Sequence, residues 1–208
     1  MHSVEDIISE EFWEARYREK PQIWSGKANR NLIAEATGLK SGRALDLGCG
    51  EGGDALWLAQ HGWTVDAADI SSVALKRGAG AAADAGVGDR IRWLQRDLVT
   101  WRPDERYDLI SAQYVHVPPA LRKELFTAAA TAVNPGGSLL IVGHALEAHR
   151  EFDGHKPPVE LFFAPEEITE LLGDPWLWLV ETCEVRGSGL ETDAVYRATR
   201  LPDAQPEM

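Results

Sequence analysis

The segment RALDLGCGEGGDALWLAQHG, residues 43–62, places glycines and carboxylates in a pattern that could bind a cofactor. Its glycines fit two spacings. Gly48, Gly50 and Gly53 fit G-x-G-x-x-G, which is typical of a pyrophosphate-binding turn. Gly48, Gly50 and Gly52 fit G-x-G-x-G, which is compatible with a nucleoside cofactor that carries a positive sulfur. In both cases glycine lets the ligand approach the backbone.

The carboxylates near these glycines distinguish the two ligands. Asp69 could hold ribose hydroxyls in either case, because an acid about 20 positions after the glycines serves both kinds of site. Asp46, Glu51 and Asp54 lie close to the turn itself. Each would repel a phosphate by about 4 kcal/mol at ~4 Å in an effective dielectric constant of roughly 20. A ligand with an ammonium group and a sulfonium is therefore favoured over a pyrophosphate.

Apolar strands and helices alternate around this segment. Strands are predicted at 43–48, 63–70, 90–98, 106–115 and 138–146, with a turn at 134–137. Helices are predicted at 30–39, at 53–61, after an N-cap at Ser71 or Ser72, and at 119–133. This alternation implies a parallel sheet with helices on both faces. The glycines then occupy the first strand-to-helix turn, where nucleoside cofactors bind.

The pattern changes after residue 150. A helix is predicted at 164–173, followed by strands at 176–187 and 192–201 that are joined by a short turn at 188–191. A short turn can join only antiparallel neighbours. We therefore predict an α/β protein with a Rossmann-like, doubly wound and mostly parallel seven-stranded sheet, which ends in a C-terminal antiparallel hairpin.

The N-terminal segment is predicted to form a helix and a loop. Apolar residues at helical spacing extend from Val4, and Pro21 ends the helix, which gives a predicted helix over 4–20. Residues 23–29 then form a loop.

Composition limits the protein class. The chain has 208 residues, of which 44% are hydrophobic, enough for one domain with a large core. Its net charge of −12 disfavours nucleic acid as a partner. The distant Cys49 and Cys183 form no disulfide framework, and the N-terminus has no signal-peptide pattern. We expect no membrane span and a cytoplasmic location; the oligomeric state is not predicted.

Several motifs now support a family resemblance. The segment LDLGCGEG, 45–52, resembles motif I of the class I S-adenosylmethionine-dependent methyltransferases, and later segments follow the same order. These later segments are VDAADIS (65–71), LQRDL (94–98), YDLISAQYVHVPP (107–119) and VNPGGSLLIV (133–142). The segment FWEARYREKPQIWSG, 12–26, is similar to small-molecule members related to thiopurine and tellurite methyltransferases.

The resemblance implies a domain organisation and a function. The chain is expected to be a single methyltransferase domain over 1–208, with an N-terminal helix and lid segment at 1–30 and a Rossmann-like core at 31–200. S-adenosylmethionine is then the cofactor, and S-adenosylhomocysteine is the product. The acceptor is expected to be an O, S or N atom of a small molecule, methylated by direct displacement.

The resemblance also assigns residues to the methionine end of the cofactor. The backbone around Gly48, Cys49 and Gly50 is expected to approach the methionine portion, and Asp46 to bind the ammonium group. A carboxylate against the sulfonium would stabilise the ground state more than the transition state, so we do not place Asp46 at the sulfur. Gln113 is expected to contact the same end.

Four further residues are expected at the nucleoside end. The resemblance places Asp69 on the ribose hydroxyls and Ile70 beside the adenine. It places Asp97 on the adenine amino group, with Leu98 next to it.

The acceptor side is less clearly marked in the sequence. His116 and His144 follow the fourth and fifth strands and are candidate general bases, although an ordinary loop histidine is the alternative for each. Tyr17 and Trp24 are candidates for a lid over the methyl group, and packing at the sheet edge is their alternative.

No metal site is expected from the acids and histidines that follow the fifth strand. Glu147, His149, Asp153 and His155 cluster in sequence, but their spacing matches no ligand pattern. Two other functions stay open at this point. One is a non-catalytic protein that binds S-adenosylmethionine, and the other is an NAD(P)-dependent oxidoreductase.

Overall fold

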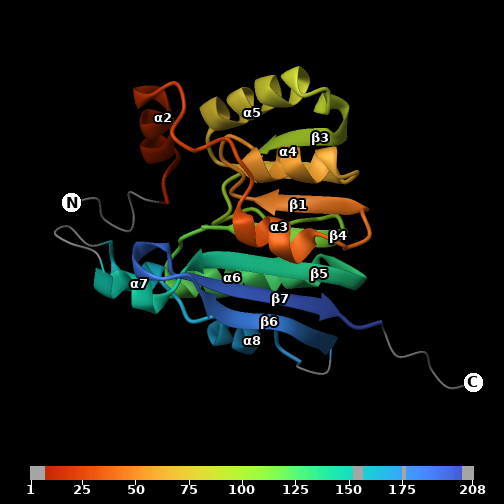
Figure 1. Cartoon of the computed structure of the whole chain (residues 1–208), viewed down its shortest axis with the longest axis vertical. Helices are drawn as coiled ribbons and strands as arrows, with labels where there is room; N and C mark the ends of the chain where they lie inside the picture. The colour runs from red at the N-terminus through yellow and green to blue at the C-terminus, as the bar shows by residue number, and fades with distance from the viewer. Residues whose placement is uncertain (1–7, 152–156, 175–176, 203–208) are drawn as a thin grey trace, which may run out of the picture.

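The computed structural model describes residues 8–151, 157–174 and 177–202, and its centre is one seven-stranded sheet (Figure 1). The strand order is β3-β2-β1-β4-β5-β7-β6. The strands are β1 (Arg43–Leu47), β2 (Thr64–Asp69), β3 (Ile91–Gln95), β4 (Tyr107–Gln113), β5 (Val133–His144), β6 (Trp178–Arg186) and β7 (Asp193–Arg200). The pairs among β1 to β5 are parallel, whereas β7 pairs antiparallel with both β5 and β6. The predicted fold class is confirmed.

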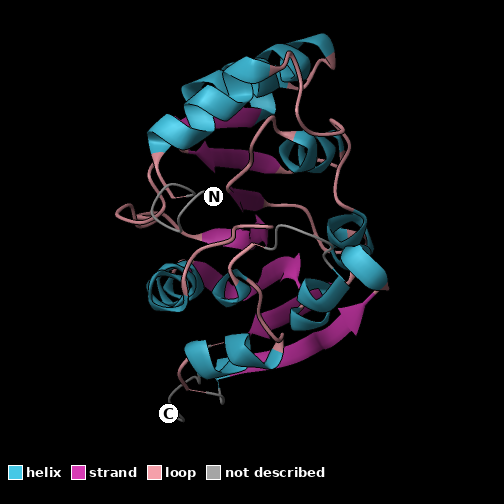
Figure 2. Ribbon diagram, turned by 90° about the vertical axis from the view of Figure 1, so that its left-hand side faces the viewer, coloured by secondary structure: helices cyan, strands magenta, loops and turns pink. Residues whose placement is uncertain are grey.

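Helices cover both faces of the sheet (Figure 2). They are α2 (Glu10–Glu19), α3 (Arg30–Ala36), α4 (Gly53–Gln60), α5 (Ser72–Asp84), α6 (Pro119–Thr131), α7 (Leu146–Glu151) and α8 (Glu166–Leu171). Short 3-10 turns lie at Gly88–Arg90, Val159–Leu161 and Gly189–Glu191. Among the described helices, none combines the length and the apolar character needed to cross a bilayer.

Two hydrophobic cores separate along alternate positions of the central strands. In β5, Leu139 and Ile141 pack with Phe126 of α6, whereas Leu140 and Val142 pack with the cluster that includes Leu58 of α4. This alternation arises because successive side chains of a strand point to opposite faces. Both faces of the sheet are apolar because helices cover both of them. This burial fixes which side chains of each central strand face which layer of helices.

Several element boundaries differ from the sequence prediction. The described N-terminal helix begins at Glu10, because the Ser9 side chain accepts a hydrogen bond from the Phe12 N–H at 3.2 Å; the predicted start, Val4, lies outside the described residues. The predicted turn at 134–137 lies inside β5, where pairing with β4 shifts register before Ser138. The predicted strand 90–98 ends at Gln95, and α7 was not predicted.

Trp93 of β3 fills a slot between the glycine turn and α5. A Cβ placed on Gly52 would lie 2.4 Å from its ring, and a Cβ on Gly78 would lie 2.5 Å from the same ring. Gly80, two residues further along α5, is exposed and has open space around it. Both glycines weaken α5 by their low helix propensity, but only one is explained by packing. Gly78 leaves room for the Trp93 indole, whereas no contact explains a glycine at position 80.

This difference gives a matched pair of substitutions. We expect Gly80→Ala to raise the free energy of unfolding by about 0.5–1 kcal/mol, because glycine is a poor helix former. We expect Gly78→Ala to lower it by roughly 1–3 kcal/mol, because the new methyl group overpacks the Trp93 slot. Urea unfolding of both variants measures the two changes. Equal changes in the free energy of unfolding for the two variants would show that the packing of Trp93 does not require a glycine at position 78.

Candidate functional site

The glycine turn lies at the carboxyl end of β1 and is held against β2. The N–H groups of Gly48 and Cys49 both donate to the Ala68 carbonyl, at 2.8 and 3.0 Å. Gly48, Gly50 and Gly52 have φ of +68°, +53° and +82°, a region that favours glycine. The spacing G-x-G-x-G is therefore the one that shapes this turn.

Three carboxylates crowd beneath the turn. Asp46 is 1% exposed, and its Oδ2 accepts no hydrogen bond within the described part of the chain. Burial and the charges of Asp54 and Asp69 raise the pKa of Asp46 well above its ordinary value. Burial also raises the pKa of Asp54 to about 6, although its Oδ1 accepts from the Asn29 N–H at 2.6 Å. A cationic group fits beside these acids, and a phosphate would add to their repulsion.

Gln113 adds a second buried acceptor at the end of the neighbouring strand. Its Nε2 donates to the Ser111 Oγ at 2.9 Å, and its Oε1 lacks a partner among the described residues. Asp46 is the register partner of Ser111, so Asp46 and Gln113 share one face at the carboxyl ends of β1 and β4. A carboxylate oxygen and an amide oxygen with free acceptor capacity suit an ammonium group, which is a donor in three directions.

Asp69 holds the glycine turn as well as standing at the predicted ribose position. Its Oδ2 accepts from the Gly50 N–H at 2.8 Å, and its Oδ1 accepts from the Ser71 N–H at 2.8 Å. Two carboxylate oxygens can accept about four hydrogen bonds, so capacity for a ligand hydroxyl remains. Ile70 follows directly, and its carbonyl accepts from the Gln95 side chain at 3.2 Å. Burial, followed by the charges of Asp69 and Asp46, raises the pKa of the Cys49 thiol.

Two of the residues expected around the adenine, Asp97 and Leu98, lie in the segment after β3. Leu98 comes within 4.0 Å of a Cβ placed on Gly48, and Val115 within 2.7 Å. Asp97 turns toward its own loop, where its Oδ1 accepts from the Val99 N–H at 2.9 Å. Leu98 is thus brought to the glycine turn, and the missed Val115 packs there too. No spacing in the sequence marks Val115.

The candidate lid residues lie on the glycine turn. The Trp24 Nε1–H donates to the Tyr17 hydroxyl at 2.9 Å. A Cβ placed on Gly50 would lie 2.9 Å from that hydroxyl and 3.3 Å from the Trp24 Nε1. Tyr17 is buried, whereas Trp24 is 47% exposed. Tyr17 and Trp24 therefore lie against the glycine turn and not at the edge of the sheet, which was the alternative for both residues.

Glu51 and Arg77 attach this segment to the core. The Glu51 Oε2 accepts from the N–H groups of Ile23 and Trp24, at 3.2 and 3.0 Å, and its Oε1 pairs with Arg77 at 2.8 Å. The other Arg77 nitrogen donates to the Tyr17 carbonyl at 2.6 Å and to the Lys20 carbonyl at 2.9 Å. The expected repulsion between Glu51 and a phosphate is therefore weakened, since Arg77 pairs with this carboxylate. Arg77 was missed because it lies 26 residues away.

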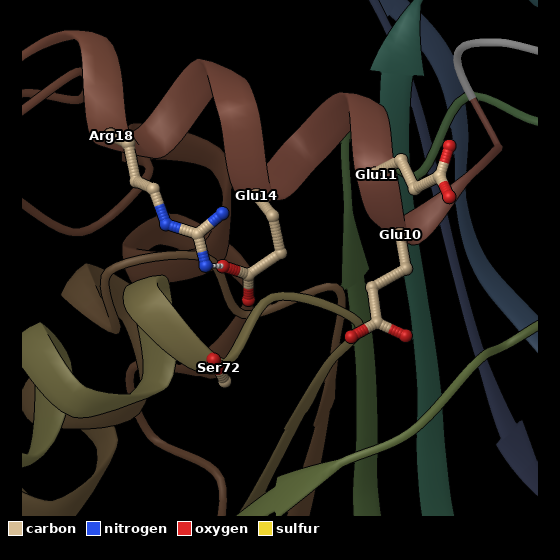
Figure 3. A pocket seen from close by; sticks show the side chains of 5 residues that line it. All are labelled: Glu10, Glu11, Glu14, Arg18 and Ser72. Atoms are coloured by element: carbon tan, nitrogen blue, oxygen red, sulfur yellow. Dashed lines mark ion pairs between the residues drawn. The ribbon is translucent and has the colours of Figure 1, made fainter.

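A groove beside α2 is separate from the glycine turn. It has a volume of about 620 Å³ and lies between α2 and the start of α5, lined by Glu10, Glu11, Glu14, Arg18 and Ser72 (Figure 3). The Glu14 Oε1 accepts from the Ser71 hydroxyl and the Val73 N–H, both at 3.3 Å. Glu14 therefore joins α2 to the start of α5.

Aromatic rings gather past the ends of β4 and β5. The His116 and His144 rings stack with centroids 5.0 Å apart, and the His144 ring lies 4.8 Å from Tyr114 and 6.0 Å from Phe162. Tyr114 has φ of +56°, a strained conformation for a non-glycine residue, at the point where the chain leaves β4. This cluster forms a wall beside the carboxyl ends of the strands, where α/β folds bind substrates.

The two histidines differ in what they can do. The His116 Nε2 accepts from the His144 backbone N–H at 3.3 Å, and burial, followed by the charge of His144, lowers the pKa of His116 to about 3. This geometry argues against His116 as the base, because its basic nitrogen is already used. His144 is one-third exposed, and its Nδ1 faces the Asp193 Oδ1 at 3.7 Å. Asp193 was not singled out from the sequence.

The described residues contain no group of three or more metal-ligating side chains. Asp153 and His155, half of the sequence cluster considered above, lie outside the described residues.

Known proteins share both the fold and the sequence pattern of this site. A family model described as "Methyltransferase domain" matches residues 44–137. A thiocyanate methyltransferase 1 of Brassica oleracea is 27% identical over 157 residues, covering 73% of this chain and 68% of the relative.

Solved structures agree with the fold. The structure "DhpI-SAH complex structure" has a TM-score of 0.67 at 21% identity and covers 96% of this chain and 98% of its own. A structure from "Conversion of a Disulfide Bond into a Thioacetal Group during Echinomycin Biosynthesis" has a TM-score of 0.72 at 22% identity, covering 92% and 91%. The matched methyltransferase domain and the carboxylates at the turn give no support to the alternative of an NAD(P)-dependent oxidoreductase. The chain therefore carries a methyltransferase domain and is an S-adenosylmethionine-dependent methyltransferase, with S-adenosylmethionine as its cofactor.

Proposed function

We propose that the chain methylates a sulfur or oxygen atom of a small molecule that lies between the lid and the aromatic wall. The observation that carries this proposal is a pair of acceptors on one face below the glycine turn, Asp46 Oδ2 and Gln113 Oε1, which have no hydrogen-bond partner among the described residues. They support a position for the ammonium group of the cofactor under Gly48 and Gly50. The cofactor supplies an activated methyl group when it is bound.

The remaining cofactor contacts follow from the positions of the other side chains. We assign Asp69 to the ribose, because it stands at the end of β2 with acceptor capacity left. Ile70 and Leu98 form apolar surfaces for the adenine, and Asp97 is assigned to its amino group. The role of the chain is then to align the acceptor with the methyl group, which can lower the barrier by up to ~7–11 kcal/mol.

Sulfur is the favoured acceptor atom. The relative from Brassica oleracea is named for thiocyanate, and one fold neighbour comes from work on a disulfide and a thioacetal. Sulfur nucleophiles also fit a wall made mostly of rings, since polarizable sulfur packs well against aromatic groups. A polymer acceptor is disfavoured because Tyr17 and Trp24 lie close over the turn.

We further propose that residues 1–208 form one domain, with residues 1–30 as helix and lid and 31–200 as core. The cysteines are free, which suits a reducing cytoplasm. The net charge of −12 disfavours nucleic acid as the acceptor.

The buried carboxylate provides the first test of this proposal. We expect Asp46→Asn to weaken binding of S-adenosylhomocysteine by roughly 10-fold to 100-fold, because a charged hydrogen bond contributes about 1.5–3 kcal/mol. Calorimetry at pH 8 measures this. Exposed Asp84, changed to Asn, is the matched control and should bind as the wild type does. Unchanged affinity in Asp46→Asn would contradict the assignment.

The same residue predicts an effect of pH on stability. The pKa of Asp46 is raised in the folded state, so its unfavourable contribution appears as pH rises through the folded pKa and is absent below the unfolded value. Without ligand, Asp46→Asn should therefore unfold at a higher temperature than the wild type at pH 8, and the two should converge as pH falls. Affinity for S-adenosylhomocysteine should also fall below pH ~6, where Asp54 gains a proton. A pH-independent difference in Tm would contradict this.

The lid attachment is tested by amide exchange. We expect Arg77→Ala to speed hydrogen exchange at the Ile23 and Trp24 amides at least about 10-fold, because Glu51 then loses the partner that holds it. The Gly48 and Cys49 amides, which donate to Ala68, should keep their protection. Arg90→Ala, at an exposed arginine whose side chain donates to the Gly62 carbonyl at 3.3 Å, is the control. Equal protection in both variants would remove the role of Arg77.

A further inference from the structure

We propose that Asp193 positions His144 as the general base, and that the acceptor arrives as a protonated weak acid, a thiol or an aromatic hydroxyl. This inference rests on the proposed function and narrows its acceptor. It adds a positioning residue from β7, a strand that contributes none of the predicted site residues.

The sheet register places the two side chains opposite each other. His144 ends β5 and Asp193 begins β7, and they are direct partners in the antiparallel pairing. Directly opposite residues have side chains within contact distance on one face. The resulting distance from His144 Nδ1 to Asp193 Oδ1 is 3.7 Å.

Asp193 is fixed by other residues and is therefore able to orient a ring. It is 1% exposed, and its Oδ2 accepts from the Asn31 Nδ2 at 3.0 Å, with an Arg30 nitrogen at 3.5 Å. Burial acts to raise its pKa, but contacts with His144 and Tyr114 and the charge of Arg30 outweigh burial and lower it. Asp193 is thus an anion at neutral pH, with Oδ1 left for His144.

The buried position of Nδ1 leaves the other edge of the imidazole for the acceptor. Nδ1 is inaccessible to solvent, while the His144 side chain as a whole is one-third exposed. A carboxylate at Nδ1 favours the tautomer with the proton on Nδ1, so Nε2 keeps its lone pair. The same carboxylate stabilises the imidazolium that forms when Nε2 takes a proton.

The groups around His144 permit this charge. Asp193 faces it from β7, and His116 and Tyr114 face it from the segment after β4. Burial keeps His116 neutral, so it does not repel a charged His144. Beyond Asp193 lies Arg30 of α3, which is paired with that carboxylate.

The chemistry then decides the class of acceptor. The acceptor heteroatom forms its bond to the methyl carbon as the bond from that carbon to the cofactor sulfur breaks, and that electron pair stays on sulfur. The acceptor proton passes to His144 Nε2 and later to water. An acceptor that is already an anion, such as thiocyanate, has no proton to lose and needs no base.

The tautomer of His144 is the first test and needs no acceptor. The protein is labelled with ¹⁵N-histidine, and the His144 signals are assigned by their absence in His144→Asn. We expect the neutral ring of the wild type to carry its proton on Nδ1, and Asp193→Asn to lose this preference. A proton on Nε2 in the wild type would overturn the proposal, because that nitrogen then could not act as a base.

Turnover is the second test, read as release of S-adenosylhomocysteine from thiophenols and phenols of graded acidity and from thiocyanate. We expect His144→Asn to lower kcat for protonated acceptors by roughly 10²–10⁴-fold and to leave thiocyanate unaffected. Asp193→Asn should cause a smaller loss that Asp193→Glu partly restores, with a changed pH profile of kcat/KM. The control is Glu170→Gln, at an exposed acid of α8.

The outcomes separate the two levels of the proposal. Equal losses for thiols and thiocyanate in His144→Asn would show a structural pair and overturn the inference while leaving methyl transfer intact. A wild-type protein that binds S-adenosylhomocysteine but turns over no acceptor would overturn the proposed function itself. A lower Tm in Asp193→Asn with an unchanged tautomer and profile would also reject the positioning role.

Discussion

A buried carboxylate oxygen, for which the described residues provide no donor, is the constraint on which our account of this site depends. Asp46 lies in the interior at the end of β1, and one of its oxygens has no donor in the described structure. A buried charge without a partner costs several kcal/mol, so a fold retains it only where something else compensates. We propose that an ammonium group on the ligand provides this compensation. The glycine turn and the strand order leave Asp46 at the carboxyl end of β1, where that group is proposed to bind.

The acids near the glycine turn make different contacts. Some lie below the turn, one shapes it, and one attaches the N-terminal segment to it. Asp46 is buried and Asp54 half-buried below the turn, where the loss of solvent raises their pKa values. Asp69 accepts from the Gly50 N–H and so sets the shape of the turn. Glu51 faces the other way and, with Arg77, holds the segment that carries Tyr17 and Trp24. Neighbouring residues in one turn thus shape the turn itself and attach the segment that carries Tyr17 and Trp24.

The sequence could predict what depends on local pattern and could not predict what depends on distant partners. The glycine spacing, the strand alternation and the closing hairpin are local, and all of them were predicted correctly. The apolar spacing that predicts a helix over 4–20 does not reveal the cap at Ser9, after which the described helix α2 begins at Glu10. The pairs Glu51 with Arg77 and His144 with Asp193 join residues far apart in the chain, and only the sheet register brings the second pair together. No spacing rule contains that information.

The account depends most on the preference of the turn for positive charge, and one calorimetric comparison on the wild-type protein tests it directly. S-adenosylhomocysteine is titrated against an analogue that lacks only the α-amino group, with NADH as a third ligand. The account predicts that the missing amino group lowers affinity by roughly 10-fold to 100-fold and that NADH does not bind. Equal affinity for the two nucleosides, or binding of NADH at the glycine turn, would contradict it.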